Sequence, residues 1–185
     1  FQAYLEKQWG PFPDDMISRW SQELDLYPVT VELLNEGLEE IRQGGSSRKL
    51  TRASIVMSRL YEEKKDPRAK ELLLPYLDLM LLPDARQVYN HDRWNSALVC
   101  FLFTCDPEGE QRIREMIQDP SRFAPYVWGV VIETVGDFGN NHWIPVLKEL
   151  RVKLGENKEE TDCIGRAIEA IYQYHPPPQE GQGTT

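Results

Sequence analysis

The sequence predicts an all-α protein built from successive pairs of amphipathic helices around one elongated hydrophobic core. Apolar residues recur at intervals of three and four along most of the 185 residues, which is the spacing of one helix face. No sustained alternation of Val, Ile or Thr is bounded by an Asn-Gly or Asp-Gly hairpin turn, so strands are not expected. Three short breaks that begin with Asp or Asn each separate an apolar helix from an amphipathic one, and this repetition predicts stacked helix pairs.

The first 45 residues are expected to form short helices without a repeated pattern. The segment GPFP at 10–13 separates the first two helices, and Asp14 is positioned to cap the second. The double glycine at 44–45 ends the third helix. The expected helices are 2–9, 14–25 and 29–43.

A repeated pattern begins at Ser46. Each apolar helix is followed by a break at Asp66, Asp106 or Asn140, and these breaks lie 40 and 34 residues apart. Seven residues after each break stands an apolar residue, and another follows one helical turn later: Leu73 and Leu77, Ile113 and Ile117, Leu147 and Leu150. The expected apolar helices are 48–64, 92–104 and 121–138, and a fourth unit begins with a helix at 159–174.

The breaks have the residues that helix starts require. The Asp or Asn of each break is an N-cap candidate, able to accept hydrogen bonds from the first amides of the next helix. Pro67 and Pro107 follow at the first helical position, where no backbone donor is required. In the third break, Gly136 and Gly139 are expected to supply the backbone conformations of a tight corner between two helices.

Three segments resemble HEAT repeats. VIETVGDFGNNHWIPVLKEL is similar to the end of one HEAT helix, the turn within the repeat and the start of its partner helix, and DPRAKELLLPYL and DPEGEQRIREMI resemble the same turn and helix. The resemblance covers about residues 48–174 and implies a right-handed α-solenoid (an α-α superhelix) of antiparallel helix pairs, with the second helices lining a shallow concave binding face. Tetratricopeptide repeats share the 34-residue period, but their small/aromatic signature is not evident in this chain.

The chain departs from the HEAT pattern in two places. Residues 83–91 make a long link between repeats, and residues 1–45 show no repeat register, so they are interpreted as an N-terminal helical cap or a separate addition. The expected organisation is a single domain with HEAT-like repeats at 46–175. A flexible tail is expected at 176–185, because three consecutive prolines cannot continue a helix.

The composition is that of an acidic chain. Its net charge of −9 and pI of about 4.9 argue against a nucleic-acid partner, since neutralising phosphates requires clustered Lys and Arg, and they favour a basic protein partner. The longest apolar stretches are about ten residues, short of the roughly 20 that a bilayer requires, so no membrane association is expected.

The compartment is predicted from the cysteines and from the start of the chain. Three cysteines form no disulfide framework, which favours a reducing compartment, the cytoplasm. No signal-peptide pattern stands at Phe1, and a start at Phe rather than Met leaves an upstream segment open. The sequence leaves the oligomeric state open as well.

No catalytic, metal or cofactor site is predicted. Gly136-x-x-Gly139 lacks the spacing of a phosphate-binding loop, and Asp137 would repel phosphate. The cysteines and histidines have no zinc-ligand spacing, and no G-x-S-x-G elbow is present. Cys100 lies in an apolar run and is expected to pack as a small hydrophobe. Acidic clusters are interpreted as solvated faces, and those at 159–160 as favourable charge in a first helical turn.

Candidate partner-binding residues lie mainly at outward positions of the second helices. They carry both charge signs, so they offer hydrogen-bonding sites rather than a groove of one sign. Trp94 and Trp143 stand near helix starts, where a large ring can cover a repeat junction or anchor a partner, whereas Trp20 and Trp128 are expected in the core. The candidate set is Arg68, Glu71, Gln111, Arg114, Trp143, Lys148 and Arg151.

The leading functional hypothesis is a non-catalytic protein-protein interaction module that binds a protein or peptide partner. An immunity-type protein, which would block a basic toxin with carboxylates, is a narrower form of this hypothesis. The alternative from another class is a HEAT-like enzyme subunit, such as a bilin lyase-like protein that handles chromophores. A HEAT-like DNA glycosylase is disfavoured, because a face that grips DNA should be basic.

Overall fold

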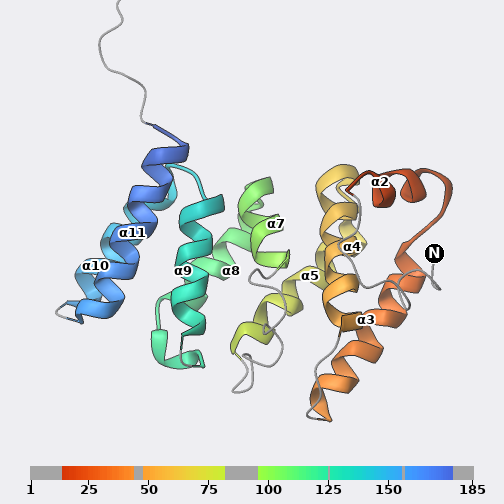
Figure 1. The fold of residues 1–185 in the computed structure, drawn as a ribbon, viewed down its shortest axis with the longest axis horizontal. Helices are drawn as coiled ribbons and strands as arrows, with labels where there is room; N and C mark the ends of the chain where they lie inside the picture. Colours follow the sequence, from red (N-terminus) through yellow and green to blue (C-terminus); the bar gives the residue numbers. More distant parts are fainter. Residues whose placement is uncertain (1–13, 44–47, 82–95, 125, 156, 177–185) are drawn as a thin grey trace, which may run out of the picture.

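The computed structural model describes residues 14–43, 48–81, 96–124, 126–155 and 157–176. Within these ranges the protein is all-helical and has no strand, as the spacing of its apolar residues predicts. None of the helices described there is both long enough and apolar enough to cross a membrane. In chain order and with the labels of Figure 1, the α-helices are α2 (Asp14–Glu23), α3 (Tyr27–Arg42), α4 (Arg48–Lys64), α5 (Pro67–Asp78), α7 (Ser96–Thr104), α8 (Pro107–Ile117), α9 (Val127–Phe138), α10 (Trp143–Leu154) and α11 (Lys158–Tyr174), and the 3-10 helices are η1 (Leu79–Leu81) and η2 (Pro120–Arg122).

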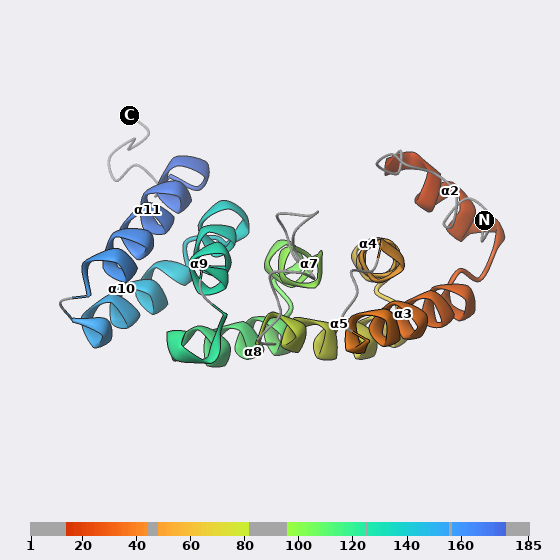
Figure 2. The same ribbon diagram turned by 60° about the horizontal axis from the view of Figure 1, so that its bottom comes forward.

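The helices form two layers that follow the chain along the long axis of the molecule. In Figure 1, α4, α7, α9 and α11 stand side by side from one end of the row to the other. Figure 2 shows α3, α5 and α8 as a second layer beneath α4, α7 and α9. Successive helices of the first layer pack directly on one another, while α5 packs on α4, α8 on α7, and α10 on α11. The packing produces one continuous hydrophobic core that reaches from Leu26 to Ile171.

The row is bent, and its ends rise on the side of α4, α7 and α9 (Figure 2). The expectation that the second helices line the concave side is therefore wrong for this chain. The physical reason is the difference in packing between the layers. Neighbouring helices of the first layer contact one another extensively, whereas α5 and α8 touch over a shorter stretch. Closer spacing in the first layer puts that layer on the inside of the bend.

The apolar stripe predicted after each break is confirmed. The residues seven positions on from the breaks, and those one helical turn later, are all at most 1 % exposed. Burying a leucine or isoleucine side chain stabilises the fold by about 1.5–3 kcal/mol. The stripe therefore supplies much of the cohesion between the layers. Its members are Leu73, Leu77, Ile113, Ile117, Leu147 and Leu150.

The first two breaks cap their helices as predicted, and the third does not. Asp66 Oδ1 accepts from the amide of Arg68 at 3.0 Å, and Asp106 Oδ1 accepts from the amide of Gly109 at 2.8 Å. Asn140 Oδ1 accepts from the amide of His142 at 3.0 Å, but α10 begins one residue later. Asn140 therefore holds the turn before the helix rather than capping the helix.

The two glycines of the third break are used for close packing. Gly136 lies inside α9 and is buried, and a Cβ atom there would stand 2.7 Å from Ala167 Cα on α11. Gly139 has a φ of −74°, which any residue can adopt, but a Cβ atom there would lie 2.4 Å from the Val135 carbonyl oxygen. Their predicted role in an unusual turn conformation is wrong, because neither has a positive φ; a side chain is excluded at Gly136 by α11 and at Gly139 by the preceding turn of α9.

The helix predicted at 121–138 begins later than expected. Residues 120–122 form η2, Phe123 is extended and Tyr126 has a left-handed φ of 70°, so α9 starts at Val127. Pro125 follows Ala124 in the sequence, and a proline disfavours the helical conformation of the residue before it. The sequence pattern does not reveal this delay, because the apolar spacing continues through the turn.

Helices α2 and α3 extend the row at its N-terminal end, and both pack on α4. Gly37 of α3 allows close contact, since a Cβ atom there would lie 2.5 Å from the Leu50 backbone nitrogen. The predicted helix at 29–43 is confirmed as Tyr27–Arg42: it begins two residues earlier and ends one residue earlier than predicted. Several predictions fall outside the described residues: the helix at 2–9, the helix end at 44–45, the link at 83–91, the first residues of the helix at 92–104 with Trp94, and the tail from 177 onward.

Candidate functional site

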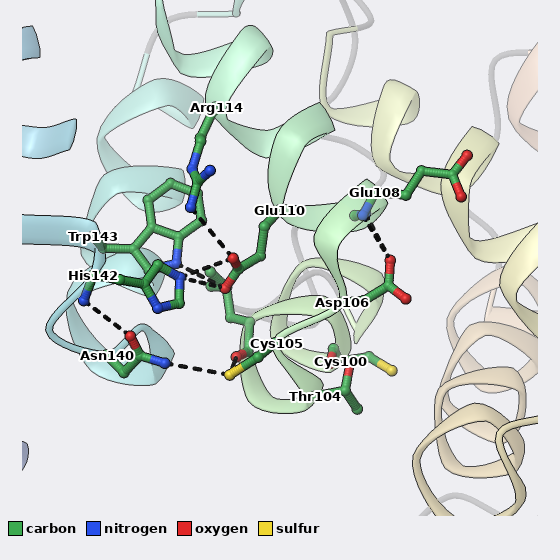
Figure 3. Close-up of polar contacts among 12 residues, drawn as sticks. Cys100, Thr104, Cys105, Asp106, Glu108, Glu110, Arg114, Asn140, His142 and Trp143 are labelled. Atoms are coloured by element: carbon green, nitrogen blue, oxygen red, sulfur yellow. Dashed lines mark hydrogen bonds and ion pairs between the residues drawn. The ribbon is translucent and has the colours of Figure 1, made fainter.

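Helix α8 carries two buried carboxylates, and each of them ties the helix to a different neighbour. Asp106 stands at the helix start and Glu110 one turn later, and they are 6 % and 5 % exposed. Figure 3 shows both carboxylates, with Glu110 directed toward the start of α10 and Asp106 apart from it at the start of α8. Because a carboxylate is almost never buried without partners, the surroundings of these two decide what each can do.

Asp106 receives hydrogen bonds from three helices. Its Oδ1 accepts from the amides of α8, and its Oδ2 accepts from the Tyr61 hydroxyl on α4 and from Lys70 Nζ on α5, the latter at 3.0 Å. Lys70 Nζ also lies 3.0 Å from a carboxylate oxygen of Glu108. We call these four residues, Tyr61, Lys70, Asp106 and Glu108, the Asp106 joint.

Ionisation in the Asp106 joint follows from these contacts. Burial by itself raises the pKa of Asp106, but the bonds from Tyr61, the Gly109 amide and Lys70 outweigh it and hold the pKa below its ordinary value. Burial, together with the bond to Asp106, raises the pKa of Tyr61 to about 12. Burial lowers the pKa of Lys70, but hydrogen bonds to Glu108 and Asp106 raise it by more, so the pKa lies above its ordinary value. Each group is thus fixed in its neutral-pH form.

Glu110 faces the other way, toward α10. Its Oε1 and Oε2 both lie 2.8 Å from His142 Nε2, and Oε1 accepts from Trp143 Nε1 at 3.1 Å. Arg114 donates to Oε2 at 3.4 Å, and its guanidinium group lies 5.1 Å from the centre of the Trp143 ring. Figure 3 shows these side chains converging on the carboxylate. We call the four residues Glu110, Arg114, His142 and Trp143 the Glu110 joint.

Two cysteines lie near the joints, one buried and one exposed. Cys100 is fully buried, its thiol contacts the Ser58 carbonyl oxygen at 3.5 Å, and burial raises its pKa, so the thiol stays protonated. The prediction that it packs as a small hydrophobe is confirmed. Exposed Cys105 accepts a hydrogen bond from Asn140 Nδ2 at 3.3 Å, which adds a contact between the two breaks. Throughout the part of the chain that the structure describes, no group of three His, Cys, Asp or Glu side chains could hold a metal ion.

A groove of about 580 Å³ lies between α9, the turn before it and α11. Its floor is apolar, and Trp128 is held in it by a hydrogen bond of 3.0 Å from Nε1 to the Ile117 carbonyl oxygen. Its rim carries carboxylates from α9 and from the first turn of α11. We call it the α9–α11 groove and define it by Tyr126, Trp128, Val130, Glu133, Glu159 and Glu160.

The predicted partner-binding residues lie on three helices: Arg68 and Glu71 on α5, Gln111 and Arg114 on α8, and Trp143, Lys148 and Arg151 on α10. Arg114 and Trp143 meet in the Glu110 joint. Trp143 is fully buried, so its ring is not exposed to a partner, and its Nε1 donates to Glu110 of α8.

The other five residues lie apart from that joint. Arg68 Nη2 lies 2.8 Å from Asp66 Oδ2, and its guanidinium group covers the Tyr27 ring. Gln111 donates to Glu115 at 2.9 Å. Glu71, Lys148 and Arg151 are exposed on the outer surfaces of α5 and α10.

Sequence reasoning missed both the Glu110 joint and the groove. Glu110 stands three residues before Ile113 and seven before Ile117, so it falls on the apolar stripe of its helix, and that position is the signal that could have revealed it. The groove gives no comparable signal, because its residues come from two separate segments, 120–133 and 157–166. Trp128 was expected in the core, and it is buried as the floor of the groove.

Comparison of the chain with protein-family models, with curated proteins and with solved structures gave no match.

Proposed function

We propose that this protein is a non-catalytic protein-protein interaction module, built as a HEAT-like right-handed α-solenoid, that binds a protein or peptide partner. The observation that carries the proposal is the state of its buried polar side chains. Asp106 and Glu110 each receive hydrogen bonds from two or three side chains of neighbouring helices. Groups that would be suited to acid-base chemistry are thus occupied in holding the helices together.

The geometry of the joints supports a scaffold. Trp143 Nε1 and the Arg114 guanidinium group can only donate, and both donate to Glu110, so each of them is engaged in holding this carboxylate. Hydrogen bonds between buried side chains restrict the relative positions of the helices that they join. Rigid helix positions leave two long outer surfaces on which a partner can dock.

The charge of the chain supports a basic partner. With a net charge of −9, the protein attracts cationic proteins at long range and repels nucleic-acid phosphates. The partner is expected to bind more weakly as salt is added, because contacts between exposed charges are screened over about 8 Å at physiological ionic strength.

Photo-crosslinking from both layers tests the proposal. A crosslinking amino acid placed at Lys148 on the second layer, or at Val130 on the first, should capture a defined partner in the source cells from at least one of them. The purified partner should then bind the purified chain with one stoichiometry. Failure of both positions to capture a specific protein, together with turnover of a small molecule by the purified chain, would reject the proposal.

A further inference from the structure

We propose that the α9–α11 groove is a docking site for a basic segment of a partner protein, whose apolar side chains enter the groove while its Lys or Arg side chains meet the acidic rim. This inference rests on the proposed function and specifies where the partner binds and with which chemistry. The argument has three steps, which concern the floor, the edge and the rim of the groove.

The floor offers apolar surface that the chain itself does not cover. Val130 projects from α9 into the groove and is 38 % exposed, although a helix of this composition would normally bury its valines. Gly129 lies beside it, and a Cβ atom there would meet only Cys163 Sγ, at 3.9 Å, so the floor is shallow and open at this point. The volume of about 580 Å³ is within the range of sites that bind small ligands and peptide side chains.

The edge of the groove is formed by an exposed aromatic residue in an unfavourable backbone conformation. Tyr126 has a φ of 70° and is 75 % exposed. A left-handed conformation is unfavourable for a residue other than glycine, because its Cβ comes too close to the following carbonyl oxygen. Strained residues of this kind persist where the surrounding structure holds them, and they concentrate at binding sites. Exposed tyrosine is also among the residues that most often anchor protein interfaces.

The rim determines the charge of the occupant. Glu159 and Glu160 stand in the first turn of α11, while Glu133 on α9 lies 3.3 Å from Arg166 and is offset by it. The groove thus keeps a net negative rim. Burial is the main cause that raises the pKa of the Cys163 thiol in the groove to about 11; Glu133 and Glu159 raise it as well, and Arg166 lowers it. Lysine or arginine beside an apolar anchor complements this arrangement, whereas an acidic segment would be repelled.

The probe is a library of random 12-residue peptides displayed on phage and selected on the full chain. Peptides that combine apolar residues with Lys or Arg should be enriched. As synthetic peptides they should bind Val130→Lys at least about tenfold more weakly than the unchanged protein, because the substitution puts a like charge on the floor. Glu159→Gln with Glu160→Gln should weaken binding several-fold and flatten its dependence on salt.

Two matched controls separate the groove from general effects. Val152→Lys makes the same change at a valine that is 82 % exposed on α10, and Glu32→Gln with Glu149→Gln removes the same number of charges from exposed positions on α3 and α10. Both should leave peptide binding unchanged. Circular dichroism and thermal unfolding of each variant verify that the fold is intact.

Several results would overturn the inference. These are the absence of enriched peptides, enrichment of acidic or uncharged peptides, and enriched peptides that bind Val130→Lys as tightly as the unchanged protein. A concentration-dependent dimer that Val130→Lys abolishes would show instead that a second copy of this chain occupies the groove. If crosslinking captures a partner on the α5 and α10 surface only, the proposed interaction function stands and the groove assignment fails.

Discussion

The Asp106 joint and the Glu110 joint both hold α8 against neighbouring helices, but they do so with different side chains. Both place a buried carboxylate of α8 against a neighbouring helix pair. Asp106 serves as helix cap and tie at once, and it accepts from the hydroxyl of Tyr61 and the ammonium group of Lys70. Glu110 caps nothing, and its partners are the ring nitrogens of His142 and Trp143 and the Arg114 guanidinium group.

The difference between the two joints follows from the residues at the breaks. The third break has Asn140 instead of an Asp-Pro pair, and its side chain is used in the turn before α10. The contact between α8 and the start of α10 is made instead by Glu110, one helical turn after Asp106. Two residues one turn apart thus connect α8 to its neighbours: Asp106 bonds to side chains of α4 and α5, and Glu110 bonds to side chains at the start of α10.

Replacing the aromatic residue of each joint should give the largest difference in stability between the two joints. Trp143→Ala is expected to lower the free energy of unfolding by about 3–5 kcal/mol, because it leaves a cavity and removes a donor from a buried carboxylate. Tyr61→Ala should cost less, since Tyr61 is 8 % exposed and Trp143 is fully buried. Urea unfolding followed by circular dichroism measures both. An equal or larger loss for Tyr61→Ala would show that the Asp106 joint is the stronger one.

Replacing each carboxylate with its amide sharpens the comparison. Glu110→Gln should cost about 1–3 kcal/mol, because the new NH2 group faces partners such as Trp143 Nε1 that can only donate. Asp106→Asn should cost less, since the Tyr61 hydroxyl can rotate and accept from the new amide. The same unfolding experiment gives the order, and a larger loss for Asp106→Asn would contradict the assigned donor and acceptor roles.

Alkaline pH should weaken the Asp106 joint selectively. The folded-state pKa of Tyr61 is raised to about 12, above the value of about 10 for an unfolded chain. A raised pKa contributes stability that is present below the unfolded value and is lost as the pH rises through the folded one. The free energy of unfolding should therefore fall between about pH 10 and pH 12, and Tyr61→Phe should reduce that slope. Glu110→Gln, the control from the other joint, should keep it.

The smallest expected effect is on the acid side. The folded-state pKa of Asp106 is lowered, so its contribution is present above the unfolded value of about 3.9 and is lost as the pH falls through the folded one. Asp106→Asn should flatten the loss of stability below about pH 4. An unchanged acid profile in this variant would mean that the hydrogen bonds from Tyr61 and Lys70 do not favour the ionised carboxylate.

The sequence by itself determined the helical content, most helix bounds, two of the three caps and the buried stripe. These features depend on contacts within four residues along the chain: Asp106 caps an amide three positions on, and Leu73 and Leu77 share a face because a helix turns every 3.6 residues. Even the late start of α9 had a local cause, although the continuing apolar pattern concealed it.

Only the tertiary structure decided what each special residue is for. Gly136 is required by Ala167, 31 residues away, Glu110 is tied to His142 and Trp143 on another helix, and the groove combines Val130 with Glu159 and Glu160. The direction of the bend likewise followed from how closely the first layer packs. The physical reason is that the shape and burial of a surface depend on distant side chains that meet only after the helices stack, and periodicity along one helix carries no information about them.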